Sequence, residues 1–117
     1  MEAKQDTIFH KIMRQEIPAK ILYEDSRIIA FRDINPVAST HVLIVPKEGI
    51  PTLNDLREEH DSLVGHMVRV ASEIAADEGI AEAGYRLVMN CGEDGNQTVL
   101  QLHIHLVGGR RMSWPPG

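Results

Sequence analysis

Two histidines lie two positions apart near the end of the chain, in the run Gln101-Leu102-His103-Ile104-His105-Leu106-Val107. Side chains alternate between the two faces of a β-strand, so this run predicts an apolar face and a polar face that carries Gln101, His103 and His105. The two imidazoles would lie about 6.6 Å apart along the strand, where one ligand can contact both. Since an imidazole can act as a nucleophile or as an acid near neutral pH, the pair indicates catalysis.

Two other interpretations of the pair remain open. The histidines can be ordinary residues at the edge of a core, or they can be two ligands of a zinc site that takes His41 as its third ligand. His41 precedes an apolar run, where a lone histidine is more often structural. The loop 91–98 leads directly to the pair, and its glycines and Thr98 could bring N–H and hydroxyl groups to an anion. Cys91 has no Cys-x-x-Cys partner and is assigned no role.

Length and composition indicate one globular domain. The 117 residues are 43% hydrophobic and 25% charged, enough for a core without disulfides or metal ions. The net charge of −5 argues against a nucleic-acid partner but leaves room for a small phosphate ligand. One cysteine favours a reducing compartment, and neither a signal peptide nor a membrane-spanning run is visible, so a cytoplasmic location is expected.

The rest of the sequence predicts the elements that must position these side chains. Turn residues and apolar periodicity predict a short helix, a hairpin, a buried strand, a long helix, a further strand and the histidine strand, in this order: 7–14, 21–23 with 27–32, 41–46, about 54–77, 85–90 and 101–107. This order predicts an α+β domain with an antiparallel sheet and helices on one face. The buried stripe of the long helix would comprise Leu56, Leu63, Met67, Val70 and Ile74, and Gly79 stands where a left-handed C-cap is expected.

Polar residues outside the histidine strand have plain structural interpretations. His10, His60 and His66 fall among charged neighbours and are expected at the surface. Asp33 stands in a turn, as an acceptor for the backbone or for the hydroxyls of a sugar. The tail holds the only tryptophan, Trp114, which we expect to dock on this chain's core, on a second subunit or at the rim of a pocket.

The histidine run resembles the signature of the histidine triad (HIT) family, His-φ-His-φ-His-φ-φ with φ apolar, in which Gln101 takes the place of the first histidine. Further segments resemble the Hint branch, the histidine triad nucleotide-binding proteins: 6–9, 14–18, 31–36, 40–46, 84–90 and 108–117. The resemblance implies a single HIT domain over 1–117, with an antiparallel sheet of about five strands, one long helix and one short helix. It also implies a homodimer that extends the sheet, and a tail, 110–117, near the active site.

The same resemblance implies an activity. Members of this branch hydrolyse purine nucleoside 5'-phosphoramidates, such as adenosine 5'-monophosphoramidate, without a metal or cofactor. His103 matches the nucleophile that forms a nucleotidyl-histidine intermediate, His105 matches a phosphate contact that assists proton transfer, and His41 orients them. The matching substrate-binding residues are Asn90, Gln97 and Thr98 for the phosphate side, Asp33 for the ribose, Phe9 and Ile34 for the base, and Trp114 for the partner subunit's site.

Gln101 departs from the family pattern. A glutamine amide donates and accepts hydrogen bonds but holds no proton at neutral pH. If the first histidine only anchors its neighbours, the enzyme should still turn over. If its charge matters, the protein would be a nucleotide-binding or scaffold dimer with weakened catalysis. Asn96 also stands where relatives commonly have glycine, and asparagine tolerates the left-handed conformation.

Overall fold

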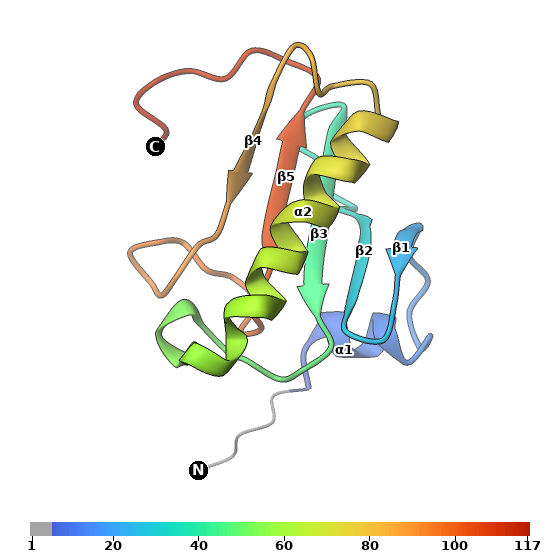
Figure 1. Cartoon of the computed structure of the whole chain (residues 1–117), viewed down its shortest axis with the longest axis vertical. Coiled ribbons are helices and arrows are strands. Elements are labelled where there is room, and N and C mark those ends of the chain that lie inside the picture. Colours follow the sequence, from blue (N-terminus) through green and yellow to red (C-terminus); the bar gives the residue numbers. More distant parts are fainter. Residues whose placement is uncertain (1–5) are drawn as a thin grey trace.

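A computed structural model describes residues 6–117, which form one antiparallel sheet with helices on both sides (Figure 1). The strands lie in the order β1-β2-β3-β5-β4, and their bounds are Ile21–Glu24 (β1), Ile28–Arg32 (β2), Thr40–Pro46 (β3), Tyr85–Val88 (β4) and Ile104–Gly108 (β5). The helices are α1 (Ile8–Met13) and α2 (Asp61–Asp77), with the 3₁₀ turns η1 (Leu53–Asp55) and η2 (Glu58–His60) before α2. This architecture confirms the α+β prediction and the five-stranded antiparallel sheet.

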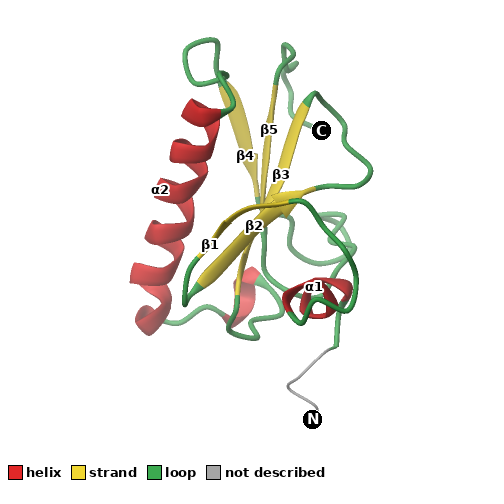
Figure 2. Cartoon of the chain, turned by 90° about the vertical axis from the view of Figure 1, so that its right-hand side faces the viewer, coloured by secondary structure: helices red, strands yellow, loops and turns green. Residues whose placement is uncertain are grey.

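The prediction that the helices share one face of the sheet is wrong. Figure 2 shows α2 on one side of the strands and α1 on the other. Strands β2 and β3 are buried on both faces, so each face needs a cover. Ile28 and Ala30 pack in the core under α2, whereas the alternate residues Ile29 and Phe31 pack with α1.

Helix α1 begins at a capping box. The hydroxyl of Thr7 accepts the backbone N–H of His10, and His10 Nδ1 accepts the backbone N–H of Thr7. Phe9 and Ile12 are buried against β2 and β3, whereas Ile8 is exposed. Within residues 6–117, no helix combines the length and the apolarity that a membrane crossing needs.

Helix α2 starts later than predicted, at Asp61. The hydroxyl of Thr52 caps η1 by accepting the N–H of Asn54. The chain is extended at Leu56, so this side chain packs against the core from a position before α2. The other four predicted stripe residues are buried on α2. Gly79 has φ +78° just after the helix, which confirms the predicted left-handed C-cap.

The expectation that three histidines are surface residues fails clearly for His60. Its side chain is buried, because Nδ1 accepts the backbone N–H of Arg57 and Nε2 lies 3.0 Å from a Glu48 carboxylate oxygen. His66 is half-buried and lies 2.7 Å from Asp25, whose carboxylate also holds the turn between β1 and β2. The carboxylates that hold these two histidines come from distant parts of the chain, 12 residues from His60 and 41 residues from His66, so the local sequence could not indicate them.

Candidate active site

The paired strands β3 and β5 carry His41 and His105, and His103 directly precedes β5, so three histidines meet on the face that α1 covers. In the antiparallel register His41 pairs with Val107, and Leu43 pairs with His105. The rings of His103 and His105 have centroids 4.9 Å apart, and those of His41 and His105 lie 5.2 Å apart. The opposite, apolar face comprises Leu102, Ile104 and Leu106, which are buried under α2 as predicted.

The ring of His103 is held in one tautomer. Its Nδ1 lies 2.6 Å from the backbone carbonyl oxygen of Gln101, which can only accept, so Nδ1 carries the proton. Burial lowers the pKa of His103 below its usual value, against the opposing effects of the Gln101 carbonyl and the charge of Asp33, so the ring is neutral near pH 7. The Nε2 atom then keeps its lone pair.

That lone pair is open to solvent on the α1 side. No hydrogen bond from a described residue reaches Nε2 of His103, and no fully buried side-chain nitrogen or oxygen in residues 6–117 lacks a partner. The edge of Phe9 packs against the ring, with centroids 4.9 Å apart. His103 therefore offers an uncharged nitrogen nucleophile whose orientation is fixed by backbone and packing.

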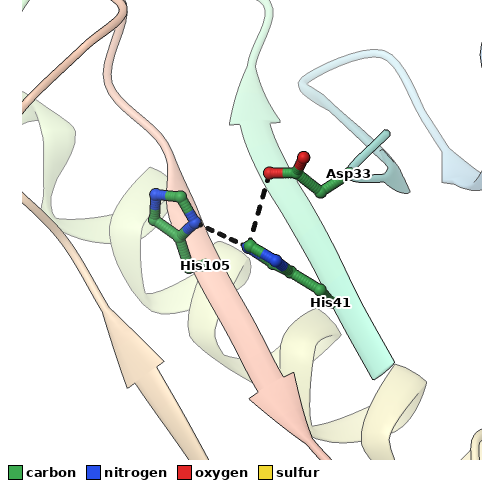
Figure 3. A group of neighbouring side chains, drawn as sticks. All are labelled: Asp33, His41 and His105. Atoms are coloured by element: carbon green, nitrogen blue, oxygen red, sulfur yellow. Dashed lines mark hydrogen bonds and ion pairs between the residues drawn. The ribbon is translucent and has the colours of Figure 1, made fainter. Parts of the chain in front are cut away.

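A hydrogen-bonded chain fixes the tautomer of His105 as well. The backbone N–H of Val37 donates to His41 Nδ1 (3.2 Å), so the His41 proton sits on Nε2. His41 Nε2 lies 2.9 Å from His105 Nδ1 and 3.4 Å from a carboxylate oxygen of Asp33 (Figure 3). Since His105 Nδ1 must accept, its own proton is on Nε2.

His105 stays neutral over a wide pH range. Burial lowers its pKa to about 4, with further lowering from His103 and His41 and a smaller opposite effect from Asp33. A second proton on His105 would also have to sit on Nδ1, facing the N–H of His41. The ring is therefore a hydrogen-bond donor through Nε2 near neutral pH, beside the bare Nε2 of His103.

A pocket of about 370 Å³ opens on these two rings. Of the predicted substrate-binding residues, Phe9, Asp33, Ile34 and Thr98 line it together with His103 and His105. Ile34 is 77% exposed and lies at the rim. Sequence reasoning missed other lining residues, among them Ile12, Ile17, Pro18, Ala19, Phe31, Leu43 and Val99. Only their apolar character could have indicated them, since they come from five separate segments of the chain.

The prediction that Gln101 shares a strand face with the imidazoles is wrong. Strand β5 begins at Ile104, so the alternation does not extend back to 101. The side chain is 1% exposed; its Nε2 donates to the carbonyls of Pro46 (3.1 Å) and Glu48 (2.8 Å), and its Oε1 accepts the N–H of Ile50 (3.2 Å). Only its backbone carbonyl contacts His103.

Three other predicted residues do not line the pocket of a single chain. The Gln97 amide donates to the carbonyls of Pro51 and Val99, which holds the loop before β5. Asn90 follows β4, which ends at Val88. Trp114 is 81% exposed, with Arg86 6.0 Å from its ring, so it does not dock on this chain's core. Asn96 has φ +61°, the left-handed conformation expected of it.

The metal-ligating side chains that come together at the site are not the three histidines considered for zinc from the sequence. Atoms of Asp33, His41 and His105 lie within 4.8 Å of one another, and His103 does not belong to this group. A histidine that binds a metal through one ring nitrogen normally donates a proton from the other. His41 Nδ1 instead accepts from Val37 N–H, so a metal on Nε2 would place two N–H groups face to face. The donor set does not fit a metal ion.

Comparisons with known proteins agree with the fold. The family model described as "Scavenger mRNA decapping enzyme C-term binding" matches residues 6–114. The chain is 54% identical over 106 residues to a purine nucleoside phosphoramidase of Escherichia coli, covering 91% of this chain and 89% of that protein. It is 50% identical over 113 residues to a "14 kDa zinc-binding protein" of Zea mays (95% and 88% covered). A HIT family hydrolase of Legionella pneumophila superposes with TM-score 0.91 at 48% identity (94% and 98% covered).

Proposed function

Because the chain belongs to the histidine triad (HIT) family, we propose that it is a hydrolase of the Hint branch that cleaves the P–N bond of purine nucleoside 5'-phosphoramidates. The expected products are the 5'-nucleotide and the free amine, with adenosine 5'-monophosphoramidate as the reference substrate. The observation that carries this proposal is the tautomer of His103, whose Nε2 lone pair is available at the pocket while Nδ1–H is held by a carbonyl.

In the first step Nε2 of His103 attacks the α-phosphorus. The P–N bond breaks, and its electron pair leaves with the nitrogen, which takes a proton from water as the amine departs. The ring becomes a positively charged nucleotidyl-imidazolium, whose Nδ1–H stays hydrogen-bonded to the Gln101 carbonyl oxygen at 2.6 Å in the free enzyme. That carbonyl dipole stabilises the charge as it develops.

In the second step a water oxygen attacks the same phosphorus and releases a proton to the solvent, which replaces the proton that the amine took in the first step. The bond between phosphorus and Nε2 breaks, its electron pair returns to His103, and the nucleotide leaves. His105 contributes Nε2–H as a hydrogen-bond donor to a non-bridging phosphoryl oxygen in both steps. Because the pKa of His105 is about 4, it acts near neutral pH by donating a hydrogen bond as a neutral ring rather than as a cation.

The pocket suits a nucleoside. Apolar side chains, including Phe9 and Ile34, line the part that would receive the base. Asp33 and Thr98 line the same pocket, and we assign them to the ribose hydroxyls and the phosphate oxygens. Asp33 has a further task, because its carboxylate lies 3.4 Å from His41 Nε2 and so links ribose binding to the histidine chain.

The hydrogen bonds of Gln101 favour the enzyme over the scaffold dimer. The amide faces the segment 46–50 and lines no part of the pocket, so exchanging the first triad histidine for glutamine removes no group that could touch substrate. The contact with His103 comes from a backbone carbonyl, which every residue type supplies.

A homodimer is part of this proposal. Strand β4 is an edge of the sheet, and all four of its residues are only half-buried in the single chain, as expected of an edge that a second copy would extend. Trp114 is 81% exposed in the single chain even with Arg86 6.0 Å from its ring, and we assign it, with Asn90 and Gln97, to a site completed by two subunits. Sedimentation of the purified chain at twice the monomer mass would support this, and a monomer would contradict it.

The test of the activity is turnover of a fluorogenic adenosine 5'-phosphoramidate. We expect wild type to release the amine and His103→Ala to lose turnover, while His66→Ala, which removes a histidine on the far side of the sheet, keeps it. Alkaline quenching during turnover should trap a nucleotidyl adduct on His103, found by intact-mass and peptide analysis. Full turnover by His103→Ala, or an adduct on another residue, would refute the proposed mechanism.

A further inference from the structure

We propose that Arg110 is a positioning residue: by holding the loop between β2 and β3, it keeps the proton of His41 on Nε2 and thereby orients His105. Arg110 lines no part of the pocket, and its side-chain hydrogen bonds go to the carbonyls of Val37 and Arg111 rather than to a histidine. The inference rests on the proposed function for its effect on rate, but its structural core, the tautomer of His41, can be measured without any substrate.

The first support is a continuous path of hydrogen bonds. Arg110 Nε donates to the backbone carbonyl of Val37 at 3.0 Å. The N–H of the same residue donates to His41 Nδ1 at 3.2 Å, and His41 Nε2 reaches His105 Nδ1 at 2.9 Å. Val37 is therefore held at its carbonyl by Arg110 and presents its N–H to the histidine.

The second support is close packing beside this path. A Cβ at Gly109 would collide with the hydroxyl oxygen of Ser39, so the chain after β5 presses directly on the loop that leads into β3. Gly109 has φ +94°, a conformation that glycine adopts without strain. The close contact between Gly109 and Ser39 fixes the backbone next to Arg110, and this in turn limits where the Arg110 guanidinium can lie relative to Val37.

The loop needs an anchor because its own side chains supply little. Val37 is exposed at 57%, and the other hydrogen bonds of the loop, from Asn35 N–H to the Asp33 carboxylate and from Asp33 N–H to the His41 carbonyl, do not hold the Val37 peptide groups. If the Val37 carbonyl were released, its N–H could turn away from His41. The His41 proton could then move to Nδ1, which would remove the donor that His105 Nδ1 now accepts.

Loss of that donor would change what faces the substrate. His105 would be free to carry its proton on Nδ1 toward His41, leaving Nε2 without a hydrogen to donate to the phosphoryl oxygen. The groups that bear on this equilibrium are Asp33, beside His41 Nε2, and His103, whose ring contacts His105. Neither can donate to Nδ1 of His105. The Asp33 carboxylate, 3.4 Å from His41 Nε2, favours a proton on that nitrogen as the Val37 N–H does, so loss of the Val37 bond leaves a mixture of tautomers rather than a complete switch.

The experiment compares Arg110→Met with Arg111→Met. Both remove an exposed guanidinium from the tail, but Arg111 makes no side-chain hydrogen bond to the described chain and serves as the matched control. Two-dimensional ¹H–¹⁵N spectra of the histidine rings report the tautomer directly. We expect His41 to keep Nε2–H in wild type and Arg111→Met, and to become a mixture of tautomers in Arg110→Met.

Turnover of the adenosine phosphoramidate supplies the second measurement. We expect kcat/KM to fall about tenfold in Arg110→Met, the lower end of what losing a group that orients a functional histidine costs. The fall should lie in kcat rather than KM, since Arg110 does not line the pocket. Arg110→Lys keeps a donor within reach of the Val37 carbonyl and should retain the wild-type tautomer.

The outcomes separate this inference from the proposed function. An unchanged His41 tautomer in Arg110→Met, or an equal loss of kcat in Arg111→Met, would overturn the role of Arg110. If wild type shows no turnover but Arg110→Met still shifts the tautomer, the role of Arg110 stands and the proposed function falls. If wild type turns over but the His41 tautomer is unchanged in Arg110→Met, the proposed function stands and the role of Arg110 falls.

Discussion

Replacing Gln101 by methionine should destabilise the fold far more than it impairs the site. The buried amide satisfies two carbonyl acceptors, of Pro46 and Glu48, and one donor, the N–H of Ile50. A primary amide has two N–H bonds and a carbonyl oxygen, so each N–H and the oxygen has a partner in this set of three. Methionine fills nearly the same volume, but it leaves all three partner groups without the hydrogen bond that the amide makes to each of them.

The cost follows from which partners can reach water. The bonds to Pro46 and Ile50 are buried, and each partner left unsatisfied costs about 1–3 kcal/mol. The carbonyl of Glu48 is only partly buried and can be hydrated. After allowing for the apolar gain of methionine, we expect the free energy of unfolding to fall by about 3 kcal/mol, a large part of the ~5–15 kcal/mol typical of a domain.

Urea unfolding followed by far-UV circular dichroism measures this, since Trp114 is too exposed for its fluorescence to report on the core. Gln97→Met is the matched control, because its amide makes the same three kinds of bond at a half-exposed site and should cost only about 1 kcal/mol. Equal losses in the two variants, or no loss in Gln101→Met, would refute the reasoning. For Gln101→His we expect turnover close to wild type; a gain of about tenfold or more would instead mean that a titrating group matters at 101.

Three further results are expected. The pKa of His105 is about 4 in the folded chain, against an ordinary value of 6.5 for an exposed imidazole, so the unfolded chain binds this proton first and stability should fall as pH drops from 6.5 to 4; His105→Gln should flatten that part of a plot of urea midpoint against pH. Ile34→Ser should raise KM for the adenosine substrate severalfold without changing the melting temperature, because this rim side chain is largely exposed already; an unchanged KM would remove Ile34 from the base site. Treatment with a chelator should leave activity unchanged and metal analysis should find less than one zinc per chain, because Val37 N–H occupies His41 Nδ1; stoichiometric zinc lost together with activity would reverse this.

Local patterns in the sequence were enough for the elements and for the two central histidines. The alternation of Leu102, Ile104 and Leu106 predicted the buried face of β5, and Gly79 predicted the end of α2. These features depend on neighbours within a few residues, where steric preference and periodicity act directly. The start of α2 escaped prediction because Thr52 and Leu56 favour a capped 3₁₀ turn and an extended residue over a regular helix.

Which face a helix covers depended on more than local pattern. The continuous apolar runs of β2 and β3 imply that both faces are buried, but nothing in the segment 8–13 shows that it packs opposite α2. Only the sheet order, with β2 and β3 near the centre, makes one short helix and one long helix cover opposite faces.

For the chemistry of the site, too, the sequence determined one part and the tertiary structure determined the other. The sequence by itself determined that His103 and His105 share a face, because strand alternation is a local geometric property. It could not determine their proton positions, which depend on Val37, His41 and the Gln101 carbonyl. His41 and His105 are 64 residues apart in the chain, and a tautomer is decided by the partner that the fold brings to each nitrogen. The residue types were therefore readable from the sequence, whereas the lone pair and the proton each ring presents were decided only by the tertiary structure.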